Sequence, residues 1–130
     1  KIEDFEAYEY LVGRNEQGGA EWLSGFGGLA REYPLIDEPV SENTIFYNEY
    51  LGEWIIAYKN NGKLRLFTSK NVSGPYKRVA QIAMPGVEVP LYGFLSSKEL
   101  SLDGGKRIAF IGSSWKPCYN TFVFEITLEK

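Results

Sequence analysis

Carboxylates and aromatic side chains are the groups in this sequence that could do chemistry, because histidine is missing altogether. Without histidine there is no Ser-His-Asp or Cys-His nucleophile system, no imidazole metal ligand and no base that titrates near neutral pH. The single cysteine, Cys118, follows Pro117 in an expected turn, and we interpret it as incidental. Seventeen Asp and Glu residues, with nine Tyr, eight Phe and three Trp, therefore have to supply any site.

Composition and charge restrict the classes of partner. A chain of 130 residues predicts a single domain, residues 1–130, with enough chain for a real core. The net charge of −3 is scattered and offers nothing to a polyanion, so we predict no nucleic-acid partner. No apolar run reaches the roughly 18 residues of a membrane helix, so we predict no membrane partner. No cluster has metal-ligand spacing, and Gly25-x-Gly27-Gly28 lacks the Lys and Ser/Thr of a phosphate loop, so we predict no metal and no cofactor.

The elements that must position such groups are strands. The same order of strands and turns occurs about twice in the C-terminal two-thirds of the sequence. Residues 43–82 alternate strands and turns, with Asn60-Asn61-Gly62 and Gly74-Pro75 as the clearest turn signals. This predicts a four-stranded antiparallel meander. Within it residues 53–58 are almost wholly apolar, which indicates a strand covered on both faces and places Trp54 in the core.

Residues 91–128 repeat the plan with one strand fewer. A strand from Tyr92 to Ser97 is followed by an Asp103-Gly104-Gly105 turn, a strand over 107–112 and a last strand over 121–128. We expect the last two strands to pair and to leave an open edge, which residues 5–12 or a neighbouring molecule would fill. A four-stranded unit followed by a three-stranded one predicts consecutive blades of a β-propeller, the last lacking a strand.

The first 42 residues carry weaker signals. Residues 5–12 alternate well enough for a strand, and Glu21-Trp22-Leu23 fits another short one. Residues 25–40 contain three glycines and two prolines, so we interpret them as an irregular crossing with at most one helical turn near Ala30. The fold class predicted is all-β, with antiparallel blade-like sheets that make up two to three blades of a propeller.

Short motifs in this order resemble glycosidase-like five-bladed propellers, in particular a family of domains of unknown function associated with endo-D-arabinanases. The motifs are Tyr8-Glu9-Tyr10, Trp22, Tyr47-Asn48, Leu51-Gly52-Glu53-Trp54, Leu64-Arg65-Leu66-Phe67-Thr68-Ser69, Gly74-Pro75-Tyr76 and Ser113-Ser114-Trp115-Lys116-Pro117-Cys118-Tyr119-Asn120. The resemblance covers most of the chain. It implies that the chain is the C-terminal part of a larger five-bladed propeller and that the N-terminal blades precede it.

The resemblance also implies where a catalytic carboxylate would lie. Glycoside hydrolysis uses two carboxylates, and in these propellers they sit at the inner strands of different blades. The inner strands here begin near Glu42 and Leu91, which makes Glu42 the catalytic candidate. A solvated loop residue is the alternative for Glu42. The resemblance implies a further carboxylate on the earliest blade, so the fragment alone is not expected to be active.

Aromatic and basic side chains complete the expected site. Sugar rings stack on aromatic platforms, and Tyr92, Trp115 and Tyr119 lie near strand ends, where pocket residues belong. Packing between blades is the alternative for Trp115. Arg65 is the candidate for contacting an acidic ligand, although a solvent-facing position explains it more simply.

The function predicted is that of a glycoside hydrolase-like propeller that acts on or binds a glycan, with this chain as one wall of the central cleft. Two alternatives stay open: a non-catalytic carbohydrate-binding module, and a structural half-propeller that assembles with another copy. The partners expected are a glycan or oligosaccharide, with the missing blades or a second copy. The resemblance to secreted propellers predicts an extracellular or cell-envelope location.

Overall fold

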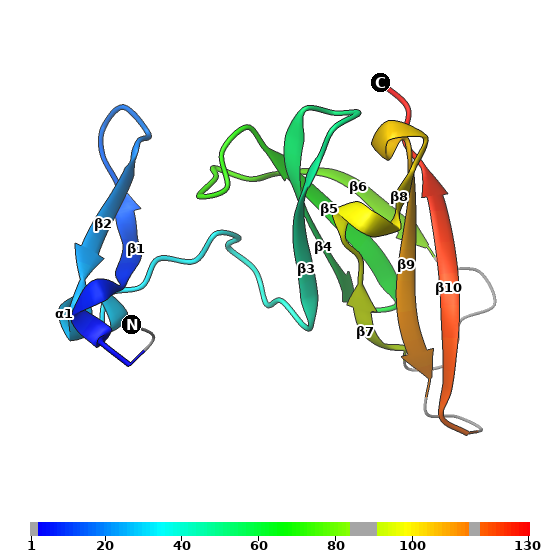
Figure 1. The fold of residues 1–130 in the computed structure, drawn as a ribbon, viewed down its shortest axis with the longest axis horizontal. Helices are drawn as coiled ribbons and strands as arrows, with labels where there is room; N and C mark the ends of the chain where they lie inside the picture. The colour runs from blue at the N-terminus through cyan, green and yellow to red at the C-terminus, as the bar shows by residue number, and fades with distance from the viewer. Residues whose placement is uncertain (1–2, 84–90, 115–117) are drawn as a thin grey trace. The chain divides into compact units, whose positions relative to one another are not determined.

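A computed structural model describes residues 3–83, 91–114 and 118–130, and the backbone alone for Leu91 and Tyr92. Its contacts divide the chain into two compact units. Unit 1 is Lys1–Asp37 with Ser73–Pro75, and unit 2 is Glu38–Val72 with Tyr76–Lys130. Figure 1 labels the elements of both units, and each unit is taken by itself below.

Unit 1 is a hairpin with one short helix. The antiparallel strands β1 (Glu9–Arg14) and β2 (Ala20–Ser24) are preceded by the 3-10 turn η1 (Phe5–Ala7) and followed by the helix α1 (Gly25–Leu29). The side-chain oxygen of Asn15 accepts the backbone N–H of Gly19 at 2.7 Å and so closes the hairpin turn. The rings of Phe5 and Phe26 stack at 5.1 Å and tie η1 to α1.

Two expectations for this region are wrong in part. The strand expected over residues 5–12 begins only at Glu9, because η1 occupies its first residues. The helical turn forms at Gly25–Leu29 and ends directly before Ala30, so it lies a few residues earlier than expected. A Cβ on Gly28 would lie 2.1 Å from the carbonyl oxygen of Leu23, so only glycine lets the helix pack this closely on β2.

The first sheet of unit 2 is the predicted meander. Its strands run in the order β3 (Asn43–Asn48), β4 (Glu53–Asn60), β5 (Lys63–Ser69) and β6 (Lys77–Ala83), all antiparallel. Asn61 and Gly62 take positive φ in the β4–β5 turn, as the sequence indicates. A register shift between Leu66 and Phe67 marks a bulge between β5 and β6.

The second sheet has the order β10–β9–β7. It consists of β7 (Leu91–Leu95), β9 (Arg107–Ser114) and β10 (Asn120–Thr127), and the short β8 (Ser101–Leu102) also pairs with β9. The 3-10 turns η2 (Lys98–Leu100) and η3 (Asp103–Gly105) flank β8. The predicted pairing of the last two strands is confirmed over their whole length. None of the sheets in the described residues closes on itself, and the all-β prediction is confirmed.

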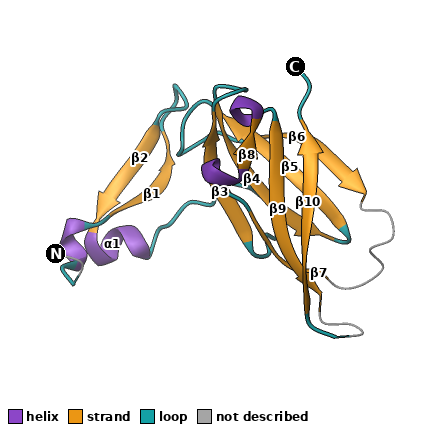
Figure 2. Ribbon diagram, turned by 45° about the vertical axis from the view of Figure 1, so that its right-hand side comes forward, coloured by secondary structure: helices purple, strands orange, loops and turns teal. Residues whose placement is uncertain are grey.

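The core of unit 2 lies between these two sheets, which face each other in Figures 1 and 2. Alternate side chains of each strand point into it, as period two requires. The fully buried members are Phe46, Ile55, Ala57, Leu64, Leu66, Phe94, Ile108 and Phe110. Side chains of β6 and β10 pack against this cluster from the outer strands, among them Ile82 and Ile126.

The central strand β4 is covered on both faces, as predicted. Residues 55–58 are all buried, although Ile55 and Ala57 face the core and Ile56 and Tyr58 face the other way. The prediction that Trp54 lies in the core is wrong. It lies on the face away from the second sheet, half-buried, with its ring edge-on to Tyr47 at 5.7 Å. Period two explains this, because Trp54 is one residue out of phase with Ile55.

One buried polar side chain joins the two sheets. Asn48, 1% exposed at the end of β3, donates from Nδ2 to the carbonyl of Gly105 in η3 at 2.8 Å. Its Oδ1 accepts the backbone N–H of Leu51 at 2.9 Å, which closes the β3–β4 turn. Gly105 has φ of 96°, and a Cβ there would lie 3.0 Å from Nδ2 of Asn48. Asn48 therefore fixes the height of one sheet against the other.

Asn48→Asp tests this join. Aspartate keeps an acceptor for Leu51 but turns its second oxygen toward the carbonyl of Gly105, where a donor is needed. We expect the free energy of unfolding at pH 7 to fall by about 2–4 kcal/mol, since a buried charge loses its partner. Urea unfolding measures it. Asn43→Asp, exposed on the same strand, is the control, and an equal small effect from both would contradict the account.

Candidate functional site

Three strands of unit 2 start at the same end. In Figure 1, β3 and β7 both begin at the end where β9 finishes and β10 begins. Glu42 directly precedes β3 and is exposed. Two residues later, the hydroxyl of Thr44 donates to the carbonyl of Ser96, so the start of β3 lies beside the segment that follows β7. The predicted acid thus stands free at this end.

The aromatic candidates are only partly described. The backbone of Tyr92 pairs with Ser113 at the start of β7. Tyr119 directly precedes β10 and is 75% exposed, and it reaches the same end because Asn120 pairs with Ser114. Trp115 lies outside the described residues. Two predicted aromatics therefore share one end of the second sheet, but whether they form a platform with Glu42 stays a prediction.

Arg65 has an acidic partner inside the protein. Its Nη1 lies 2.6 Å from Oε1 of Glu38, and its Nε donates to the side chain of Gln81 at 3.2 Å. The hydroxyl of Tyr58 donates to the same oxygen of Glu38. A ligand carboxylate would have to displace Glu38 to reach Arg65. The three side chains hold the segment before β3 on the face of the first sheet that points away from the core.

The electrostatics of this cluster keep all three groups in their usual charge states. The hydrogen bond from Tyr58 lowers the pKa of Glu38; partial burial opposes the shift, and Arg65 then adds to it. Burial raises the pKa of Tyr58 to about 12, and Glu38 contributes to that rise. Glu38 also raises the pKa of Arg65. An ionised Glu38 between two donors is a structural clamp, not a proton donor.

Sequence reasoning assigned no role to Glu38, which lies in a loop next to Pro39. Tyr58 is the residue from which a partner like Glu38 could have been predicted. Its ring fills an apolar strand and stacks on Phe67 at 5.8 Å, and a buried tyrosine hydroxyl needs an acceptor. Arg65 sits directly across the strand pair from Tyr58. A carboxylate from the segment before β3 is the group that satisfies both.

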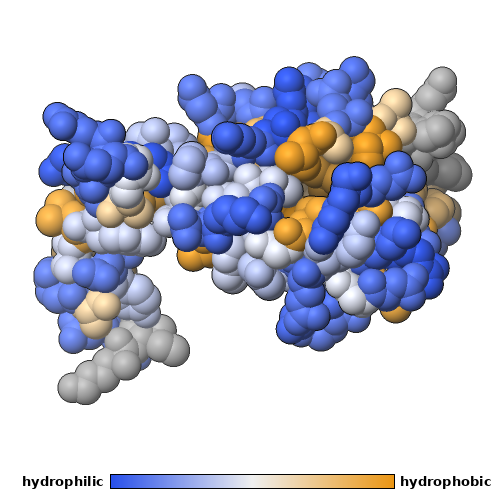
Figure 3. Space-filling view, turned by 90° about the horizontal axis from the view of Figure 1, so that it is seen from above, coloured by the Kyte–Doolittle hydropathy of each residue, from blue (hydrophilic) through white to orange (hydrophobic). Residues whose placement is uncertain are grey.

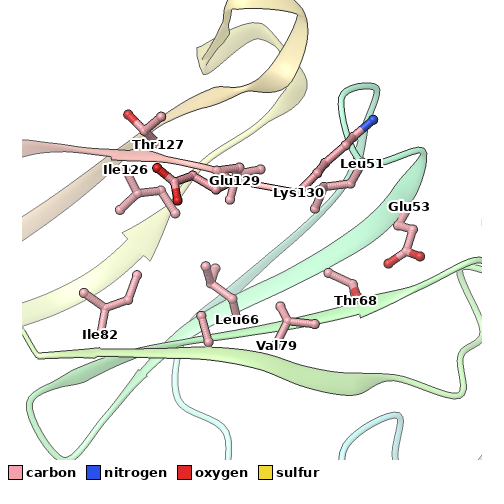
Figure 4. Close-up of a pocket in the computed structure, with 12 residues that line it drawn as sticks. Leu51, Glu53, Leu66, Thr68, Val79, Ile82, Ile126, Thr127, Glu129 and Lys130 are labelled. Atoms are coloured by element: carbon pink, nitrogen blue, oxygen red, sulfur yellow. The ribbon is translucent and has the colours of Figure 1, made fainter.

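A groove also opens between the outer strands of the two sheets. It has a volume of about 570 Å³ and lies between β5 and β6 on one side and β10 with the C-terminal residues on the other. Figure 4 shows apolar side chains facing each other across it, and its apolar lining includes Leu66, Val79, Ile82, Ile126 and Leu128. Figure 3 looks onto the end of unit 2 where the C-terminus emerges and shows apolar side chains open among polar ones.

The groove offers poor chemistry for hydrolysis. Its acid near the β4 end, Glu53, is bound to Lys70 at 3.0 Å. A hydrogen bond from Thr68 and a second from Lys70 lower the pKa of Glu53, so this carboxylate stays ionised near neutral pH and has no proton to donate. The groove suits apolar contact more than acid catalysis.

The described part of the chain has neither a metal-ligand cluster nor a membrane-spanning helix. There, no three His, Cys, Asp or Glu side chains gather as metal ligands would. No described helix combines the length and the apolar character needed to cross a bilayer.

Neither a protein-family model nor a curated protein sequence matches this chain.

The clamp predicts a pH dependence of stability. Because Glu38 has a pKa below its ordinary value of 4.5 when folded, its stabilising effect is complete above that value and is lost as the pH falls through the folded pKa. Glu38→Gln should lower the unfolding free energy at pH 7 and flatten its decline between about pH 5 and pH 3. Urea unfolding at each pH measures both. Glu42→Gln, an exposed carboxylate in the same segment, is the control, and identical pH profiles for wild type and Glu38→Gln would contradict the clamp.

Proposed function

We propose that unit 2 is two consecutive blades of a β-propeller whose parent protein acts on or binds a glycan, with this chain as one wall of the central cleft. The proposal combines the motif resemblance given above with one structural observation. Both sheets place their strands in chain order outward from β3 and from β7, and these two first strands contact each other.

The packing supports this arrangement of blades. At the inner strands, Thr44 and Asn48 of β3 bond the backbone of Ser96, which follows β7, and of Gly105 in η3. At the outer strands the sheets diverge enough to leave the groove between β6 and β10. Sheets that touch at their first strands and open toward their last ones have the wedge form that blades around an axis need.

In this proposal the cleft is lined by the strand starts. Glu42 supplies one carboxylate, and Tyr92, Trp115 and Tyr119 supply the faces on which sugar rings stack. The second carboxylate comes from a blade outside this chain. Arg65 stays in the proposal as a candidate for contacting an acidic sugar. The carboxylate of the sugar would have to displace Glu38 from Arg65.

A structural half-propeller that assembles with another copy is the second candidate. The observation that favours it is the last strand, β10, which pairs with β9 alone among the described strands. This candidate needs no catalytic role for Glu42, whose exposure is then that of an ordinary loop residue.

Tyr119→Ala tests the glycan proposal in this chain. Tyr119 is 75% exposed, so its removal should leave the fold intact. D-arabinan oligosaccharides should then bind roughly two- to tenfold more weakly, since one stacked ring contributes about 0.5–1.5 kcal/mol. Calorimetric titration measures the affinity. Tyr33→Ala in unit 1 is the matched control. Absence of binding by the wild type, or equal weakening by both variants, would contradict the proposal.

The catalytic role of Glu42 needs the remaining blades. In a protein that carries them, Glu42→Gln should reduce hydrolysis by orders of magnitude and leave the melting temperature almost unchanged, because the side chain is exposed. Activity retained in full would leave only the binding and structural roles.

A further inference from the structure

Three of the four sheet edges in unit 2 carry devices that stop a strand from adding to them. The edge strand β3 has neighbouring segments packed beside it, because it contacts β7 and η2 and its side chains bond the backbone of Ser96 and Gly105. The edge strand β6 begins with Lys77 and Arg78 and is bulged against β5. The edge strand β7 is broken by a register shift between Tyr92 and Leu95. Bulges, cationic residues and covering segments are how proteins protect edges.

The fourth edge, β10, has none of these devices. It runs for eight residues in unbroken register with β9. Its sequence, Asn-Thr-Phe-Val-Phe-Glu-Ile-Thr, contains no lysine, arginine or proline. Its one charge, Glu125, is paired with Arg107 of β9 at 3.2 Å. A long, regular and weakly charged edge is a template for another strand.

The register between β10 and β9 shows which residues of β10 an added strand would bond. The backbone N–H of Leu128 donates to the carbonyl of Lys106, which continues the β10–β9 ladder by one residue. Neighbouring residues of an antiparallel strand direct their N–H and C=O groups to opposite sides. Even-numbered residues therefore bond β9. The groups on the open side belong to Thr121, Val123, Glu125 and Thr127.

An apolar row leads to this edge. Leu95, Ile111 and Val123 are direct partners across β7, β9 and β10 on the face away from the first sheet. They are 54%, 37% and 70% exposed. The row ends at the edge strand on its most exposed member, so it stays incomplete unless a neighbour continues it.

The hairpin of unit 1 is already paired. We had expected residues 5–12 as one possible filler, but β1 pairs with β2 over its length, and among the described strands none pairs with the open side of β10. Among the described strands, then, the open side of β10 has no partner, and a second molecule could supply one.

We propose that β10 is a self-association surface, on which β10 of a second copy of this chain pairs antiparallel with Val123 opposite Val123 at the two-fold axis. The proposal rests on the second candidate function, assembly with another copy, and does not depend on glycan binding. The apolar rows of the two copies then join into one strip of six side chains, three from the second sheet of each copy. On the core face, Phe122, 40% exposed, comes opposite Phe124 of the second copy, and aromatic cross-strand pairs are favourable.

The two neighbouring positions for the two-fold axis, Phe124 and Glu125, would each bring unfavourable side-chain pairs together across the two strands. A two-fold at Phe124 puts Val123 opposite Glu125 and interrupts the apolar strip. A two-fold at Glu125 puts two carboxylates opposite each other, which is unfavourable. With the axis at Val123, each Glu125 faces Thr121 of the other copy and keeps its own Arg107.

Sedimentation equilibrium tests the association. One strand pair is a small interface, so we expect a monomer–dimer equilibrium with a dissociation constant between about 1 µM and 1 mM. Val123→Lys places two ammonium groups at the axis and should weaken the dimer at least about tenfold. Val72→Lys makes the same exchange at an exposed valine outside the strands and should leave the dimer unchanged.

Cross-linking tests the register without relying on affinity. The single thiol, exposed Cys118, is first removed as Cys118→Ser. In that background Val123→Cys should form an intermolecular disulfide under mild oxidation, since residues opposite each other in a bonded pair lie about 5.5 Å apart at Cα, within disulfide reach. Glu125→Cys and Val72→Cys should cross-link much more slowly.

Each outcome decides the proposal. A concentration-dependent dimer that Val123→Lys weakens and Val72→Lys does not, with rapid cross-linking at residue 123, supports it. A wild type that stays monomeric up to about 1 mM overturns it. A dimer that both lysine variants weaken equally, or faster cross-linking at residue 125 than at 123, also overturns it.

Discussion

The structure of unit 2 depends on a core that neither of its sheets can bury alone. Phe46, Ile55 and Leu66 from the first sheet pack in one cluster with Phe94, Ile108 and Phe110 from the second. Apolar burial is not directional, so it holds the sheets together without fixing their relative height. Asn48 does that, because one amide satisfies a turn in its own sheet and a carbonyl in the other. The match of polar partners therefore selects one of many possible apolar packings.

The features with functional interest lie where this packing ends. At the strand starts, loop segments bring Glu42 and Tyr119 to the surface, and the Glu38 clamp fastens the chain just before β3. At the outer strands the sheets separate into an apolar groove. Beyond that lies β10, whose open side has no strand among the described residues. The proposed cleft and the proposed dimer edge thus use different parts of the same two-sheet body.

Much of the fold could be predicted from the sequence because turns and period two are local signals. Asn61-Gly62 fixed the β4–β5 hairpin, and the alternation of Phe122, Phe124 and Ile126 fixed the face of β10. The predictions that failed did so for different physical reasons. Trp54 left the core because phase, not hydrophobicity, decides the face of a strand. The helix at Gly25 formed against propensity because Gly28 packs on a backbone carbonyl. The Glu38 clamp joins residues 27 apart, a distance that no local pattern reports.

Amide hydrogen exchange on the native protein at two concentrations tests the central claim, that unit 2 is one cooperative two-sheet body in which β10 is the edge open to another strand. The account predicts that amides of β4 and β9 exchange with the same high opening free energy and that those of Phe122, Phe124 and Ile126 are protected by β9. It predicts that amides of Val123 and Glu125 exchange fast in dilute solution and slow as the concentration rises. Independent opening of β4 and β9, or protection of Val123 and Glu125 that is the same at both concentrations, would contradict it.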